Sequence, residues 1–215
     1  LLLILIPVQL LAQTRSKIAT PSEFLGFEVG ADRTLADYKQ IRNYFKSLDA
    51  ASNRIELEVL GKTTLGEDMF QAVISSEANL REKMKYQEIA RKLADPRGLS
   101  QTEIDGLVRD GKAIVLVSCD IHASEIAATQ MAMEWAHALV TADDPETTRW
   151  LDEVILLLVP SLNPDGQMME TAWYRKNLGT RYEGGRMPWL YHHYVGHDNN
   201  RDWYMLTQQE SKLTI

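Results

Sequence analysis

The sequence has 215 residues, of which 45% are hydrophobic, 25% charged and 8% aromatic, which excludes collagen-like, low-complexity and fully disordered proteins. A formal net charge of −7, without a long run of basic residues, argues against nucleic acid as a partner. The single cysteine, Cys119, excludes a disulfide framework and a four-cysteine zinc site.

The first 13 residues are apolar and uncharged, and polar residues 14–17 follow them. A span across a bilayer needs about 20 apolar residues, so we expect no stable membrane span here. The segment resembles the end of a secretory signal without its basic start, which predicts a secreted or periplasmic protein. A clipped buried strand or helix is the alternative. Because the sequence opens on Leu1 and closes on Ile215, we expect a fragment, with one partial domain over residues 20–215.

The next segments alternate between two periodicities. Residues 34–48 place apolar side chains at helical spacing, and residues 54–60 alternate apolar and charged side chains as a half-buried strand does. A glycine-bounded turn over 61–66 leads to a second strand over 68–74, so we predict a β-hairpin. Residues 78–110 are charged, helical in composition and poor in large apolar residues, which predicts a helical insertion on the surface.

Two continuous apolar runs, residues 113–119 and 154–159, flank a helical pattern over 124–140. Strands that are covered on both faces need such runs, and strand, helix and strand in this order form a βαβ unit with a parallel pair. We therefore predict an α/β fold: a mixed, largely parallel central sheet with helices on both faces, incomplete at its C-terminal side. In such sheets ligands bind beyond the carboxyl ends of the strands.

His122 and Glu125 follow the first apolar strand directly. An imidazole and a carboxylate three residues apart at a strand-to-helix corner can face one point, and zinc accepts both ligand types. A structural alternative is that Ser124 caps the helix and Glu125 lies at its positive end. Taken alone, this pair does not decide between them.

Three further blocks follow, and each could be an ordinary turn or solvated loop. The second strand ends in Asn-Pro-Asp-Gly at residues 163–166, which predicts a tight turn. Tyr-Arg-Lys comes at 174–176, and the last block, residues 196–203, reads Gly-His-Asp-Asn-Asn-Arg-Asp-Trp.

In this order, the four blocks resemble the zinc carboxypeptidase family, which includes carboxypeptidase A. The resemblance spans about residues 36–203 and is specific only because all four blocks occur in sequence. The length of the 78–110 segment points to the larger secreted bacterial branch of that family. The resemblance implies a Zn²⁺-dependent hydrolase that removes residues from the C-terminus of a peptide or protein substrate.

The roles below are those that the resemblance implies. His122 and Glu125 match two zinc ligands, and Asp198 matches a carboxylate that orients the ligating histidine. Arg175 matches the cation that polarises the scissile carbonyl. Asn200 and Arg201 match the pair that holds the terminal carboxylate of the substrate.

The family's third ligand, a histidine, and its general base, a glutamate, are expected beyond Ile215, so we expect the 215-residue chain itself to bind zinc weakly and to be inactive. Specificity for the substrate side chain stays open for the same reason. Four other histidines are weaker candidates for the third ligand: His137, His192, His193 and His197. Two other functions remain open, namely a non-catalytic peptide-binding module and a zinc amidase or deacylase.

Overall fold

The computed structural model describes residues 18–190, 192 and 194–215. Residues 1–13, on which the prediction of a secretory signal depends, lie outside the described residues. Four strands form one open sheet in the order β1-β2-β4-β3. Their bounds are β1 (Ile55–Lys62), β2 (Asp68–Ile74), β3 (Ala113–Ser118) and β4 (Val154–Val159).

The sheet is mixed, as predicted. Strands β1 and β2 form the predicted antiparallel hairpin, and β3 pairs with β4 in parallel from Ala113↔Val154 to Ser118↔Val159. Strand β2 pairs antiparallel with β4. Among the described residues, one of the three strand pairings is therefore parallel and two are antiparallel. The sheet is less parallel than the sequence predicted. The reason is that a hairpin strand, β2, lies beside β4.

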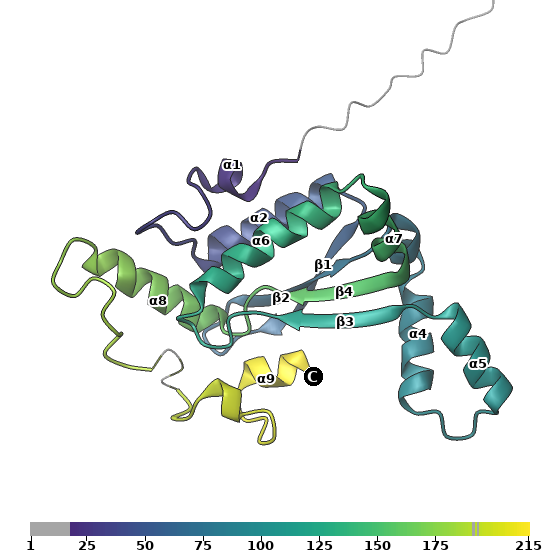
Figure 1. The fold of residues 1–215 in the computed structure, drawn as a ribbon. Coiled ribbons are helices and arrows are strands. Elements are labelled where there is room, and N and C mark those ends of the chain that lie inside the picture. Colours follow the sequence, from purple (N-terminus) through teal and green to yellow (C-terminus); the bar gives the residue numbers. More distant parts are fainter. Residues whose placement is uncertain (1–17, 191, 193) are drawn as a thin grey trace, which may run out of the picture.

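Helices α2 (Tyr38–Ala51) and α6 (Ile126–Thr141) cover one face of the sheet (Figure 1). Helix α2 begins at a capping box, in which Asp37 and Gln40 each accept a hydrogen bond from the other's backbone N–H. The main core lies between these helices and the strands, and α1 (Pro21–Leu25) lies above them.

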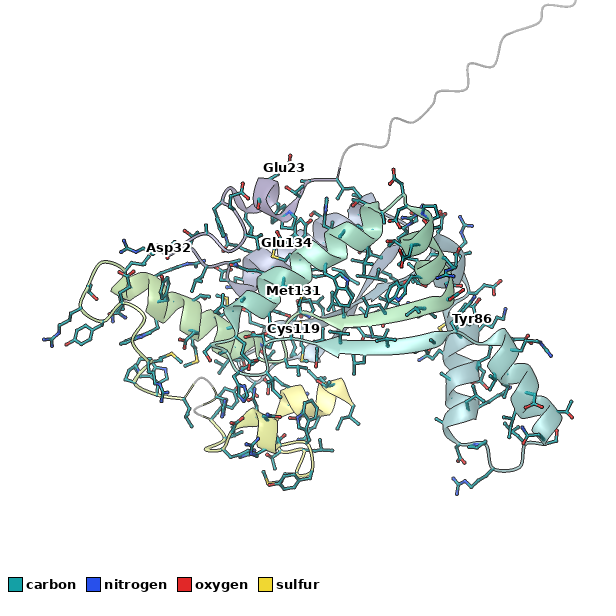
Figure 2. The ribbon with its side chains drawn as sticks, in the orientation of Figure 1. Glu23, Asp32, Tyr86, Cys119, Met131 and Glu134 are labelled. Atoms are coloured by element: carbon teal, nitrogen blue, oxygen red, sulfur yellow. The ribbon has the colours of Figure 1, made fainter. Side chains whose placement is uncertain are left out.

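Three helices occupy the segment predicted to be helical: α3 (Glu77–Arg81), α4 (Lys83–Ala94) and α5 (Gln101–Asp110). Tyr86 and Ile89 on α4 are buried against Val73 and Ile155, which lie on the second face of the sheet. Figure 2 shows Tyr86 on the side of α4 nearest the strands. The prediction of helices on both faces is therefore confirmed.

Strand β3 is less buried than its sequence predicts. Ile114 and Val115 are each 40% exposed and Leu116 is 51% exposed, although the apolar run predicts cover on both faces. The reason is its place in the sheet: among the described residues β3 is an edge strand that pairs with β4 alone. Edge position depends on the neighbouring segments and not on the strand's own composition.

The remaining elements are α7 (Pro145–Glu153), α8 (Pro164–Asn177), the 3₁₀ helix η1 (Asn199–Arg201) and α9 (Gln209–Thr214). The prediction of a tight turn at residues 163–166 is wrong. Asn163 is instead the N-cap of α8, its side chain accepts from Gly166 N, and Pro164 takes the first helical position. In the part of the chain that the structure describes, no helix is both long and apolar enough to cross a membrane.

Candidate functional site

The candidate site lies at the end of the sheet where the parallel strands β3 and β4 have their carboxyl ends. The arrowheads of both strands lie there (Figure 1), and Cys119 marks the end of β3 (Figure 2). Residues 120–125 form the corner between β3 and α6, and residues 160–163 form the corner between β4 and α8. Because β3 and β4 pair in parallel, the two corners that follow them lie at the same end of the sheet, as the sequence predicted.

His122 and Glu125 face each other at the first corner. The Nδ1 atom of His122 lies 2.8 Å from Glu125 Oε1, and Glu125 Oε2 accepts a hydrogen bond of 3.2 Å from the His122 backbone N–H. Of the structural alternative, the part in which Ser124 caps the helix is wrong, because the N-cap of α6 is Glu125, which makes no side-chain capping bond. The part that places Glu125 at the positive end of the helix is confirmed. The corner therefore presents an imidazole and a carboxylate as a pair.

Asp198 contacts the other side of the same imidazole. Its Oδ1 atom lies 3.3 Å from His122 Nε2, so His122 is held between two carboxylates. The hydrogen bond to Glu125 is the main cause that raises the pKa of His122, and the charge of Asp198 adds to it. A carboxylate on one ring nitrogen fixes a proton there and leaves the opposite nitrogen available to a metal.

The pair fits a metal ion in two respects. Two donor atoms about 2.0–2.2 Å from a tetrahedral zinc lie about 3.3 Å apart, so the gap between His122 and Glu125 has to open by only about 0.5 Å. The orienting carboxylate is also present. However, within the described residues no group of three or more His, Cys, Asp and Glu side chains is arranged to hold a metal ion.

Asn200 and Arg201 lie next to this pair. They belong to η1, and the neighbouring Asn199 donates a hydrogen bond to the carbonyl of Ile121, the residue before His122. Asp198 accepts from the Asn200 backbone N–H at 2.7 Å. Both side chains are exposed, and among the described residues the Arg201 guanidinium makes one hydrogen bond, to the Asn200 carbonyl at 3.2 Å.

Arg175 is not brought to His122. It lies in the last turn of α8, and its guanidinium binds the segment that opens α2. Its Nη1 atom donates to Asp37 Oδ2 at 2.8 Å, while Nη2 donates to the Leu35 carbonyl at 2.8 Å and to Gln40 Oε1 at 3.0 Å. These contacts fasten the end of α8 to the capping box of α2.

The second corner uses its polar groups to hold the fold together. Asp165 is buried and binds the turn of the β1–β2 hairpin, with Thr63 Oγ1 donating at 2.6 Å and Leu65 N at 2.8 Å. Burial raises the pKa of Asp165, although these two hydrogen bonds lower it in part.

Two buried carboxylates near the site were not singled out from the sequence. Asp120 has a left-handed φ of 58° and is bound by Ser161 Oγ at 2.6 Å, and burial raises its pKa to about 8. Asp202 accepts from Thr207 N at 3.1 Å and from Gln208 N at 2.9 Å. Burial alone would raise the pKa of Asp202, but its hydrogen bonds hold it well below the usual range. Neither residue has a spacing signal that could have found it.

The other histidines take different positions. His137 is half-buried on α6, with Nε2 3.4 Å from the Ile18 carbonyl, and His192 is buried. The Nε2 atom of His197 lies 2.9 Å from Asp202 Oδ1. His193 lies outside the described residues. Of the described histidines, His122 is the one whose ring contacts both Glu125 and Asp198.

A family model described as zinc carboxypeptidase matches residues 41–214, more than half of the chain. No curated protein matches the chain.

Among solved structures, a Burkholderia mallei protein designated a carboxypeptidase shares 16% identity over 84% of this chain and 35% of its own, with a TM-score of 0.53. A metallo-carboxypeptidase from Burkholderia cenocepacia shares 17% identity over 84% of this chain and 37% of its own, with a TM-score of 0.49. Carboxypeptidase A from Helicoverpa armigera shares 17% identity over 72% of this chain and 29% of its own, with a TM-score of 0.45. The chain thus spans about a third of the length of these structures.

Proposed function

The chain belongs to the zinc carboxypeptidase family, and from this premise we propose that the protein of which it is part hydrolyses C-terminal peptide bonds with the help of Zn²⁺. The observation that carries the proposal is the position of His122 between Glu125 and Asp198, at the edge where parallel strands end. We also propose that the reaction occurs outside the cytoplasm, on the strength of the leader-like residues 1–13.

His122, through Nδ1, and Glu125 would hold the ion. Bound zinc polarises a carbonyl and lowers the pKa of a water molecule. Three protein ligands are usual at catalytic zinc sites, so we place the third ligand, and the glutamate that acts as general base, outside the described residues.

Asp198 would keep the proton of His122 on Nε2. Its distance of 3.3 Å to that atom supports the role, because a hydrogen bond there directs the lone pair of Nδ1 toward Glu125. The same Asp198 oxygen accepts from the Asn200 backbone N–H. One carboxylate therefore couples the orientation of the imidazole to the position of the residues that would bind substrate.

Asn200 and Arg201 would bind the terminal carboxylate of the substrate. The guanidinium of Arg201 has one hydrogen bond among the described residues, so most of its donors remain available. Two parallel N–H groups of a guanidinium match the two oxygens of a carboxylate. This contact would restrict the reaction to the last peptide bond.

Arg175 would stabilise the negative charge that develops on the scissile carbonyl oxygen. To do so it has to exchange its contacts with Asp37, Leu35 and Gln40 for the substrate. In the intact protein we expect Arg175→Ala to lower kcat with little change in KM, at a cost of about 2.7–4 kcal/mol to the transition state. An unchanged kcat would leave Arg175 with its role at α2 alone.

The direct test of the function is hydrolysis of a blocked dipeptide by the intact, zinc-loaded protein. We expect turnover of the substrate with a free C-terminal carboxylate and little turnover of its C-terminal amide. Arg201→Ala should remove most of this preference, whereas Lys176→Ala, a cation at the end of α8, should leave it intact. Equal turnover of both substrates would instead favour an amidase or deacylase.

A non-catalytic peptide-binding module that keeps Asn200 and Arg201 as its carboxylate-binding pair is the second candidate, and the exposure of both side chains favours it. Such a module would bind the peptide with a free carboxylate but would not hydrolyse it. Binding without turnover by the intact, zinc-loaded protein would identify this second function.

A further inference from the structure

A second concave region lies on the face of the sheet that α4 covers. It has a volume of about 150 Å³ and is partly open to solvent, between α4 and the strands. Its lining includes Ile114, Ile155 and Leu157, which belong to the first four residues of β3 and β4. The candidate site lies beyond the carboxyl ends of these strands, and the two regions are therefore separate.

The floor of this cavity is apolar and well packed. Val73 and Ile155 are 1% and 3% exposed, and Ala90, Ile114 and Leu157 complete the apolar lining. An apolar cavity of about 150 Å³ can hold a benzene ring. The floor is therefore of the right size for a branched aliphatic or aromatic side chain.

The rim of the cavity carries both signs of charge. Lys83 Nζ lies 2.6 Å from Glu58 Oε1 and 2.6 Å from Glu56 Oε1, and Gln71 Nε2 donates to Glu58 Oε2 at 2.7 Å. Burial opposes the charge of Lys83, but the two carboxylates outweigh it and raise its pKa, so Lys83 is cationic. Both Lys83 and Glu58 line the cavity.

Each charge at the rim retains capacity for at least one more hydrogen bond. An ammonium has three donors, of which Lys83 uses two, and a carboxylate offers about four acceptor positions, of which Glu58 uses two. The carboxylates of Glu56 and Glu58 and the ammonium of Lys83 carry a net charge of −1. A monoanion would meet the two carboxylates, and a monocation would leave the third donor of Lys83 unused. A zwitterion can direct its carboxylate to Lys83 and its ammonium to Glu58.

We propose that this cavity binds a free α-amino acid with an apolar side chain, of the size of leucine or phenylalanine. The side chain would lie on Val73, Ile155 and Leu157, with the two charged groups at the rim. The proposal does not depend on the proposed function and needs no metal. If the proposed function holds, free α-amino acids are its products.

The test is a calorimetric titration of the intact protein with L-leucine and three partial ligands. Isopentylamine lacks the carboxylate, 4-methylpentanoate lacks the ammonium and glycine lacks the apolar side chain. We expect saturable binding of leucine, with each partial ligand at least about tenfold weaker. Isopentylamine or 4-methylpentanoate binding as well as leucine would overturn the assignment of a zwitterion, and no saturable leucine binding would overturn the site.

Two pairs of variants locate the ligand. Ala90→Leu should fill the cavity and abolish leucine binding, while Ala94→Leu, on an exposed position of the same helix, should not. Lys83→Gln should remove the preference for leucine over isopentylamine, whereas Lys85→Gln, which is exposed and paired with Glu82, should keep it. Undiminished binding by Ala90→Leu protein with normal helix content would place the ligand elsewhere and overturn the proposal.

Discussion

The two corners that follow the parallel strands lie at one edge of the sheet but differ in what their polar groups do. At the first corner the side chains of His122 and Glu125 are 28% and 44% exposed. At the second corner Ser161, Asn163 and Asp165 are at most 2% exposed. His122 and Glu125 therefore stay accessible to a ligand, whereas the second corner uses its polar groups for internal hydrogen bonds, one of which holds the buried Asp120 of the first corner. Substitutions at the second corner should affect stability, and those at His122 and Glu125 should affect binding.

The largest loss of stability is expected for Asp165→Ala. This change leaves Thr63 Oγ1 and Leu65 N without their acceptor and detaches the hairpin turn from α8. We expect the free energy of unfolding to fall by about 2–4 kcal/mol, measured by urea denaturation. A loss below about 0.5 kcal/mol would show that the corner does not hold the hairpin.

A smaller loss is expected for Asn163→Ala. Asn163 Oδ1 accepts from Gly166 N at 3.0 Å and caps α8. Loss of such a cap costs about 1 kcal/mol, and Asn163→Ser, which keeps an acceptor oxygen, should recover most of it. Equal losses in the two variants, again by urea denaturation, would mean that the cap is not what stabilises the corner.

The pH dependence of stability gives a third test of the second corner. Burial raises the pKa of Asp165, so between the ordinary value near 3.9 and the raised value the folded state binds more protons than the unfolded state. The contribution of Asp165 to stability should therefore be greatest below about pH 4 and should decline as the pH rises through that interval. We therefore expect the wild type to lose unfolding free energy relative to Asp165→Asn as the pH rises from 4 to 7. A difference that grows with pH would contradict the sign of the shift.

The smallest change in stability is expected at the first corner. His122→Ala and Glu125→Ala remove a partly exposed pair, which contributes about 0.5 kcal/mol or less. Thermal unfolding without added metal should therefore be almost unchanged in both variants. A loss as large as that of Asp165→Ala would mean that both corners serve the fold, and the contrast between them would disappear.

Much of the fold could be predicted from local patterns. The alternation over residues 54–60 and the two apolar runs place the hairpin and the βαβ unit, because each depends on periodicity within one segment. The exposure of β3 could not be predicted, because it depends on which strands lie beside it. The turn predicted at residues 163–166 became a helix start, since Asn before Pro suits both.

The site was predictable only in part. The His122–Glu125 pair follows from the spacing at a strand end, and Asp198 was found through the family resemblance. The partners of Arg175 lie more than 130 residues away in sequence, and no local pattern encodes them. Asp120 and Asp202 owe their shifted pKa values to burial and to hydrogen bonds that form only in the folded chain.

The central claim is that His122 and Glu125 form the metal-binding pair and that Asp198 orients it. The most direct measurement is a zinc titration of the 215-residue chain followed by NMR of the rings of its five histidines. We predict that the His122 signals shift first, that Glu125→Gln abolishes this shift, and that Asp198→Asn weakens zinc binding by about 10–100-fold. If zinc instead shifts His192, His193 or His197 while His122 stays unchanged, or if Glu125→Gln binds zinc as the wild type does, the account is contradicted.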